Sequence, residues 1–137
     1  MNAEQNKAIV VRFNKEFIEQ NNESSFSELL SENVVNHSVP AGMPNGKESF
    51  YFFLNNVLRA GFPNLKVDIL EQVAEGEFVT TRKKIKATHT GNIFGIAPSN
   101  KEVEINIIEM VRIQDGKYAE HWGHSNFDEV LKQVSTA

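Results

Sequence analysis

The sequence contains no cysteine, which excludes disulfides, thiolate metal sites and cysteine nucleophiles. It also lacks an excess of basic residues, because 14 Lys and Arg stand against 18 Asp and Glu for a formal net charge of -4. A nucleic-acid partner is therefore not expected. No apolar run approaches the roughly 18 residues of a membrane span, and the N-terminus has no basic region followed by an apolar stretch. These absences predict a cytoplasmic protein that binds neither nucleic acid nor membrane.

The composition that is present is that of an ordinary folded domain. Hydrophobic residues make up 40% of the 137 residues and charged residues 23%. The length fits one domain, because domains usually span about 100–150 residues. No internal repeat or low-complexity tract divides the chain. We therefore expect a single domain over residues 1–137.

The first half of the chain and its last residues have the periodicity of helices. Apolar residues recur three or four positions apart over residues 3–20, 47–60 and 127–134, which predicts three amphipathic helices. Ser25 followed by Glu28 has the spacing of a capping box and predicts a further short helix that starts at Ser25. Residues 33–38 indicate a brief extended segment.

After Leu65 the period changes to two. Extended runs over residues 65–74, 78–89, 102–114 and 117–124 predict long strands, and Asp115-Gly116 suits a two-residue hairpin turn between the last two. Helices followed by a meander of strands are typical of an α+β fold, in which helices pack on one face of a curved, mainly antiparallel sheet. Such a sheet and its helices enclose a cavity, where a small ligand would bind.

Glu109 is the most unusual residue of the predicted sheet, because it interrupts an otherwise apolar strand face. A two-residue turn at 115–116 places Glu109 opposite Trp122 and His124 near Ile107, so that Glu109, Trp122 and His124 share one face. A carboxylate among apolar groups has a raised pKa and suits acid/base catalysis. A carboxylate that is paired with a cation, or that lies in a dimer interface, explains the pattern equally well.

The four histidines, His37, His89, His121 and His124, are further candidates, because imidazole exchanges protons near neutral pH. His121 and His124 leave opposite faces of a strand, so they cannot chelate one metal ion, and no metal site is expected. His89 ends a strand, and His37 precedes a loop rich in proline and glycine. Either histidine could line a ligand pocket, or it could be a partly exposed residue that only forms hydrogen bonds.

Two other residues are candidates for contact with a ligand. Lys83 falls on the apolar face of its predicted strand, where a cation either lines a pocket or extends its long stem toward water. Tyr51 flanks the apolar stripe of the helix over residues 47–60, where core or dimer packing competes with ligand contact.

Four segments resemble the SnoaL-like polyketide and ester cyclases of the nuclear transport factor 2-like superfold. They are NKAIVVRFNKEFIEQNN, VVNHSVPAGMPNGKESFYFFL, THTGNIFGIAPSNKEVEI and RIQDGKYAEHWGHSNF, in the family's order and spacing. The resemblance implies a cone-shaped α+β barrel, usually a homodimer, with a hydrophobic pocket and no metal or organic cofactor. The best-known members close polyketide rings by intramolecular aldol condensation.

The resemblance also suggests which residues line the pocket. His37, His89, Glu109, His121 and Trp122 match pocket-associated positions of the family. In a departure from the family, Gly123 and Asn126 stand where it often has aspartates.

Two functions remain open at this point. The first is a cofactor-independent acid/base enzyme acting on a small hydrophobic carbonyl compound, with Glu109 and either His124 or His89 as catalytic residues. Its substrate would contact His37, Trp122, His121, Tyr51 and Lys83. The second is a pocket protein that binds a hydrophobic molecule without catalysis. A homodimeric partner-binding module, as in nuclear transport factor 2 itself, has less support.

Overall fold

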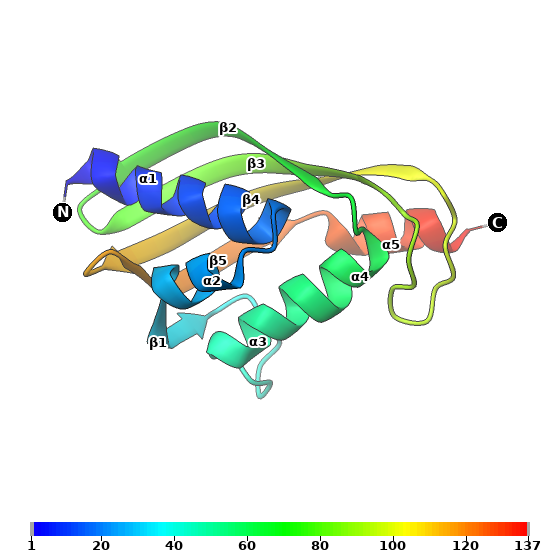
Figure 1. Ribbon diagram of the computed structural model, residues 1–137, viewed down its shortest axis with the longest axis horizontal. Coiled ribbons are helices and arrows are strands. Elements are labelled where there is room, and N and C mark those ends of the chain that lie inside the picture. The colour runs from blue at the N-terminus through cyan, green and yellow to red at the C-terminus, as the bar shows by residue number, and fades with distance from the viewer. Residues whose placement is uncertain (1, 137) are drawn as a thin grey trace.

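The computed structural model describes residues 2–136, in which helices precede and cover a sheet of long strands (Figure 1). The helical elements are α1 (Ala3–Arg12), the π-helical η1 (Phe13–Glu19), α2 (Glu23–Leu29), α3 (Lys47–Tyr51), the π-helical η2 (Phe52–Leu58), α4 (Arg59–Gly61) and α5 (Phe127–Ser135). The strands are β1 (Leu30–Asn36), β2 (Lys66–Glu75), β3 (Phe78–Thr88), β4 (Glu102–Gln114) and β5 (Lys117–Ser125). No helix within residues 2–136 is long and apolar enough to cross a membrane.

The five strands form one sheet in the order β1-β5-β4-β3-β2. β1 runs parallel to β5, and the other neighbouring strands are antiparallel. In Figure 1 the helices α1 to α4 lie on one side of the long, curved strands, and α5 lies beyond the end of β5. The predicted α+β architecture is confirmed. The sheet is curved but open, so the cone is not a closed barrel.

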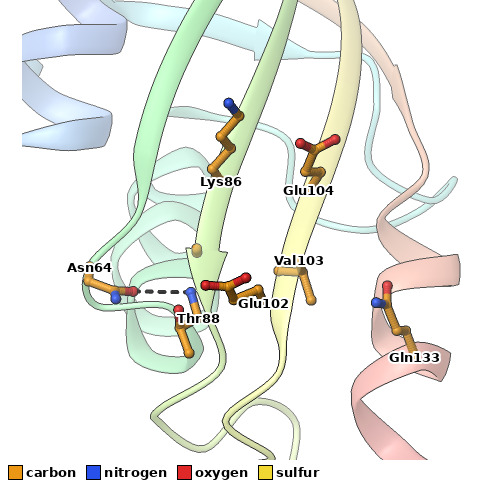
Figure 2. Close-up of a pocket in the computed structure, with 8 residues that line it drawn as sticks. Asn64, Lys86, Thr88, Glu102, Val103, Glu104 and Gln133 are labelled. Atoms are coloured by element: carbon orange, nitrogen blue, oxygen red, sulfur yellow. Dashed lines mark hydrogen bonds between the residues drawn. The ribbon is translucent and has the colours of Figure 1, made fainter.

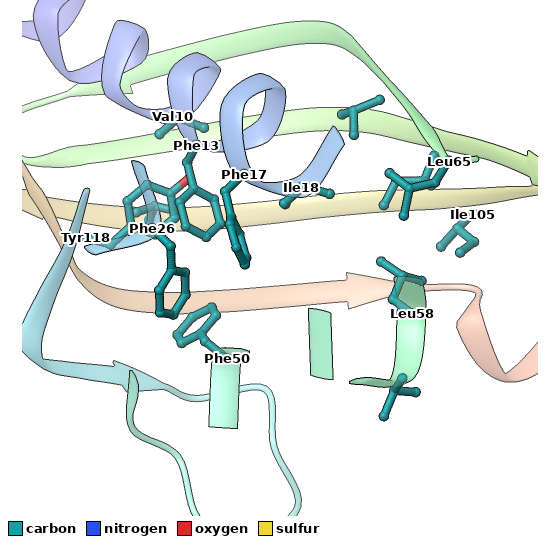
Figure 3. Close-up of a cluster of buried hydrophobic side chains, with 14 of the residues drawn as sticks. Val10, Phe13, Phe17, Ile18, Phe26, Phe50, Leu58, Leu65, Ile105 and Tyr118 are labelled. Carbon is teal, nitrogen blue, oxygen red and sulfur yellow. The ribbon is translucent and has the colours of Figure 1, made fainter. Parts of the chain in front are cut away.

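Aromatic rings fill the space between the helices and the sheet. Phe13 and Phe17 on η1 stack near Phe26 of α2, and the ring centroids of Phe17 and Phe26 are 4.6 Å apart (Figure 3). Phe13 also packs on Tyr118 of β5, with ring centroids 4.6 Å apart. Burial of each such side chain stabilises the fold by roughly 1.5–3 kcal/mol. These contacts join η1 to α2 and to β5.

The second helix begins earlier than the sequence predicts. Asn22, and not Ser25, is its N-cap, because the Asn22 side chain accepts a hydrogen bond from the Ser25 backbone N–H at 3.2 Å. The Ser25 hydroxyl instead donates to Glu16 Oε1 at 2.6 Å. The predicted capping box of Ser25 and Glu28 is therefore wrong, because an asparagine three residues upstream satisfies the same backbone donor.

The hairpin between β4 and β5 is confirmed, but its register is not. Asp115 and Gly116 form the turn with φ of 53° and 76°, and Gln114 pairs with Lys117. The register then shifts, because Ile113 pairs with Tyr118 whereas Arg112 pairs with Glu120, which leaves Ala119 as an extra residue in β5. This bulge moves every later residue of β5 by one position and therefore to the other face of the sheet.

Candidate functional site

A buried ion pair lies on the inner face of the sheet, the face that the helices cover. Lys83 of β3 and Glu109 of β4 have 3% and 5% of their side-chain surfaces exposed, and Lys83 Nζ lies 2.8 Å from Glu109 Oε1. Lys83 also donates a hydrogen bond to Asn14 Oδ1 on η1 at 2.6 Å. The ammonium group thus has two oxygen partners, which offset part of the cost of its burial.

His121 of β5 completes this cluster. Its Nε2 lies 3.6 Å from Glu109 Oε1, and its Nδ1 lies 3.0 Å from Asn36 Oδ1 on β1. The imidazole and the ring of Phe50 on α3 pack edge to face, with ring centroids 5.3 Å apart. Side chains from the four elements η1, β3, β4 and β5 therefore meet around the pair of Lys83 and Glu109, and we refer to Asn14, Lys83, Glu109 and His121 as the inner cluster.

The charge state of Glu109 follows from these neighbours. Burial raises the pKa of Glu109, but the Lys83 ammonium and the nearby imidazole of His121 outweigh burial and lower this pKa to about 2. The predicted raised pKa is wrong, and the alternative of a carboxylate paired with a cation describes Glu109, because Lys83 lies beside it. Glu109 is therefore ionised at neutral pH.

Tyr118 supplies a buried hydroxyl beside this cluster. The side chain is 1% exposed, and its hydroxyl has no hydrogen-bond partner among the described residues. Burial, and after it the charge of Glu109, raises the pKa of Tyr118 well above its ordinary value. The hydroxyl therefore keeps its proton and is able to donate a hydrogen bond.

Three of the predicted site residues lie on the outer face instead. Trp122 and His124 pair with Met110 and Ile108, on the face opposite to Glu109. His37 stacks on Trp122 with ring centroids 4.7 Å apart, and His37 Nε2 lies 2.9 Å from Glu120 Oε2. The predicted grouping of Glu109 with Trp122 and His124 is wrong, because the bulge at Ala119 places Gly123 opposite Glu109.

The remaining candidates, His89 and Tyr51, contact other parts of the core. His89 is fully buried, its Nδ1 accepts a hydrogen bond from the Ser99 backbone N–H at 3.1 Å, and its ring lies near Phe62. The Tyr51 hydroxyl donates to Glu23 Oε1 at 2.8 Å, and its ring packs on Phe26. The Nδ1 contact of His89 thus joins the two ends of the loop after β3, whereas His89 Nε2 is buried without a hydrogen-bond partner among the described residues, and Tyr51 joins α3 to α2.

The surface of residues 2–136 includes two hollows near the candidate residues. One is lined mostly by polar side chains at the end of β3 and β4, among them Asn64, Lys86, Glu102 and Glu104, and Asn64 accepts a hydrogen bond from the Thr88 backbone N–H there (Figure 2). The other has a volume of about 320 Å³ and lies between α2 and α3. Its lining residues are Glu23, Phe26, Ser27, Lys47, Glu48 and Tyr51. We call this second hollow the α2–α3 hollow.

The model of the SnoaL-like polyketide cyclase family matches residues 8–134. The chain belongs to this family. A search of curated proteins found no match.

Solved structures of the same fold include proteins that have been given different provisional names. A protein of Jannaschia sp. CCS1, provisionally named a SnoaL-like polyketide cyclase, is 24% identical with a TM-score of 0.84 over 98% of this chain and 94% of that chain. IdmH of Streptomyces antibioticus, provisionally named a polyketide cyclase, is 23% identical with a TM-score of 0.82 over 96% and 99%. AclR of Streptomyces galilaeus, provisionally named a hydroxylase, is 22% identical with a TM-score of 0.85 over 97% and 82%. These likenesses establish the fold and leave the reaction open.

The departure from the family's sequence pattern lies directly at the inner cluster. Gly123, where the resemblance leads us to expect an aspartate, pairs with Glu109 across β4 and β5. A Cβ atom at Gly123 would lie 3.0 Å from His121 Cε1, so this position borders the imidazole. Asn126 does not contact the inner cluster. Its side-chain oxygen accepts a hydrogen bond from the Asn106 backbone N–H at 2.8 Å, which joins the start of α5 to β4.

Three residues of the site, Asn14, Asn36 and Tyr118, were missed from the sequence. Asn14 had a visible signal, because it interrupts the apolar stripe of the first helix between Phe13 and Phe17. Asn36 had none, since an asparagine near the end of a short strand is ordinary. Among residues 2–136, no group of three histidine, cysteine or acidic side chains is arranged to hold a metal ion.

Proposed function

We propose that this protein is a cofactor-independent acid/base enzyme of the polyketide (aldol) cyclase type that acts in the cytoplasm on a small hydrophobic carbonyl compound. The observation that carries the proposal is the buried inner cluster, in which an ionised Glu109 lies 3.6 Å from the imidazole of His121 on the helix-covered face. Glu109 faces Gly123 across the strands, so its carboxylate lies beside the position where the family often has an acid.

In this proposal His121 moves the proton. Its Nε2 takes the proton α to a carbonyl, and the carboxylate of Glu109 stabilises the imidazolium that forms. The resulting enolate carbon bonds to a second carbonyl carbon of the same molecule, and His121 returns the proton to the new alkoxide oxygen. Lys83 and the unpartnered hydroxyl of Tyr118 supply positive charge and a donor for the enolate oxygen.

The α2–α3 hollow is the proposed entrance. Phe26 lines it and packs on Phe13, whose ring covers Tyr118. Tyr51 lines it as well, and the preceding residue, Phe50, contacts His121. Phe13, Phe26 and Phe50 belong to one cluster of buried hydrophobic side chains (Figure 3), and in this proposal they stand between the hollow and the inner cluster. These rings suit an apolar substrate, which would displace them on entry.

The test is hydrogen exchange at the carbon next to a carbonyl. We expect the protein to catalyse uptake of deuterium from D₂O into the α position of small apolar ketones and β-ketoesters, followed by mass spectrometry. Heat-denatured protein is the control for exchange by buffer. Binding of such compounds in a titration without any catalysed exchange would contradict the proposal.

A second function, binding without catalysis, has one observation in its favour. The carboxylate of Glu109 is engaged by Lys83 at 2.8 Å, which holds its pKa near 2 and makes it a weak base. A site of this kind can hold a polar group of an apolar ligand without moving a proton. The exchange experiment separates the two functions, because a binding protein changes only the amount of bound compound.

We also propose that the chain forms a homodimer through the outer face of the sheet. Four exposed apolar side chains lie there, Val73, Phe78, Ile108 and Met110, and we call them the outer patch. Val73, Thr80, Met110 and Trp122 follow one another across four neighbouring strands. Val73 is 71% exposed and Ile108 is 56% exposed, so a second copy that covered them would remove substantial apolar surface from water.

Ile108→Glu should weaken this dimer by about a hundredfold or more, because a carboxylate would be buried in an apolar interface. Light scattering over a dilution series measures the change. Met43→Glu is the matched control, since Met43 is 58% exposed and lies outside the outer patch. A monomer for the unmodified protein at micromolar concentration would contradict the proposed dimer.

A further inference from the structure

Asn36 is held rigidly beside His121. The two residues are partners in the parallel pairing of β1 and β5. The Asn36 backbone N–H donates to the Asn45 carbonyl at 2.8 Å, and the neighbouring His37 N–H donates to the His121 carbonyl at 2.7 Å. The backbone on both sides of this contact is thus fixed by hydrogen bonds.

The side-chain oxygen of Asn36 is identified by a second contact. The Ser38 backbone N–H donates to Asn36 Oδ1 at 3.0 Å. A backbone N–H can only donate, so the atom that receives it must be the amide oxygen and not the amide nitrogen. The same atom lies 3.0 Å from His121 Nδ1. An oxygen of this kind only accepts, so His121 Nδ1 must carry a hydrogen.

We propose that Asn36 is a positioning residue that fixes His121 as the Nδ1–H tautomer and thereby leaves Nε2 as the nitrogen that gains and loses a proton. Nε2 faces Glu109 Oε1 at 3.6 Å, and Lys83 is bound to that carboxylate. On its other side the ring meets Phe50 of α3, which carries no charge. The tautomer is a property of the folded protein, and its use in proton transfer rests on the proposed function.

The test is ¹⁵N NMR of the His121 ring, recorded at about pH 9, where imidazole is ordinarily neutral. We expect the Nδ1–H signature in the unmodified protein. Asn36→Leu removes one hydrogen bond worth about 1 kcal/mol, so the ratio of Nδ1–H to Nε2–H should fall by about fivefold to tenfold. Asn36→Asp keeps an oxygen for both donors and should restore the Nδ1–H form.

Asn33→Leu is the matched control, because Asn33 lies on the same strand with an exposed side chain. The ratio should stay unchanged in it. An Nε2–H signature in the unmodified protein would overturn the proposal even if Asn36→Leu failed to fold, and so would an unchanged ratio in a folded Asn36→Leu variant. If the tautomer is Nδ1–H but no exchange of α protons is catalysed, the proposed function fails and the positioning by Asn36 stands.

Discussion

Lys83→Met alone should lower the free energy of unfolding by about 3–5 kcal/mol, because it leaves the buried carboxylate of Glu109 without its cation. Glu109→Gln alone should also be costly, since it leaves a buried ammonium. The double variant Lys83→Met with Glu109→Gln should recover most of this loss, because no charge then remains buried. Urea unfolding of the four proteins at neutral pH gives the coupling energy of the pair.

Arg82 and Glu71 provide the matched control for this cycle. They also pair across neighbouring strands, at 2.6 Å, but their side chains are 52% and 67% exposed. Their coupling should stay below about 1 kcal/mol, because water screens both charges. A coupling of the same small size for Lys83 and Glu109 would contradict the buried ion pair.

The same pair predicts how stability depends on acid. The folded-state pKa of Glu109 is lowered to about 2 from an ordinary value of 4.5, so its contribution to stability is complete above pH 4.5. That contribution is lost as the pH falls from 4.5 toward 2, because the unfolded chain then binds a proton more readily than the folded one. The loss should amount to about 3 kcal/mol and should be missing from the Glu109→Gln variant.

His121→Gln should lower the turnover of a substrate by about 10² to 10⁴-fold, the usual contribution of a positioned proton-transfer group. Glutamine is similar in size and polar, so binding of the substrate should change little. The readouts are kcat from steady-state kinetics and the affinity for the same compound from a binding titration.

His124→Gln is the control, because His124 lies only three residues away but on the exposed outer face, opposite Ile108. Its turnover should match that of the unmodified protein. If His121→Gln retains full turnover, or if His124→Gln loses it, then the inner cluster is not the catalytic site.

The general architecture could be predicted because it depends on local patterns. The change from helical to alternating periodicity near Leu65 separates the helices from the long strands, and Asp115-Gly116 marks the hairpin. Glu109 was recognisable as unusual for the same reason, since it interrupts an apolar strand face. These signals lie within a few residues of one another along the chain.

The partners of Glu109 could not be predicted because they depend on register and on distant segments. Nothing in the sequence marks Ala119 as the site of a bulge. Because of this bulge, His121 and Gly123 lie on the inner face, and Trp122 and His124 lie on the outer face. Lys83 was a candidate, but the sequence did not show whether its ammonium group lines a pocket or reaches water. The ammonium group is buried because it binds Asn14 on η1 and Glu109 on β4. The contact between Asn36 and His121 joins residues 85 positions apart.

The bulge at Ala119 also determines how β5 can change in evolution. Neighbouring positions of this strand face different environments, since 121 and 123 border a buried ion pair whereas 122 and 124 meet whatever lies outside the sheet. A substitution alters one of these environments at a time. Insertion or deletion of a single residue between Ala119 and Gly123 would exchange them all at once, whereas a change of two residues would preserve them. Length at this point of the chain is therefore more tightly constrained than residue type.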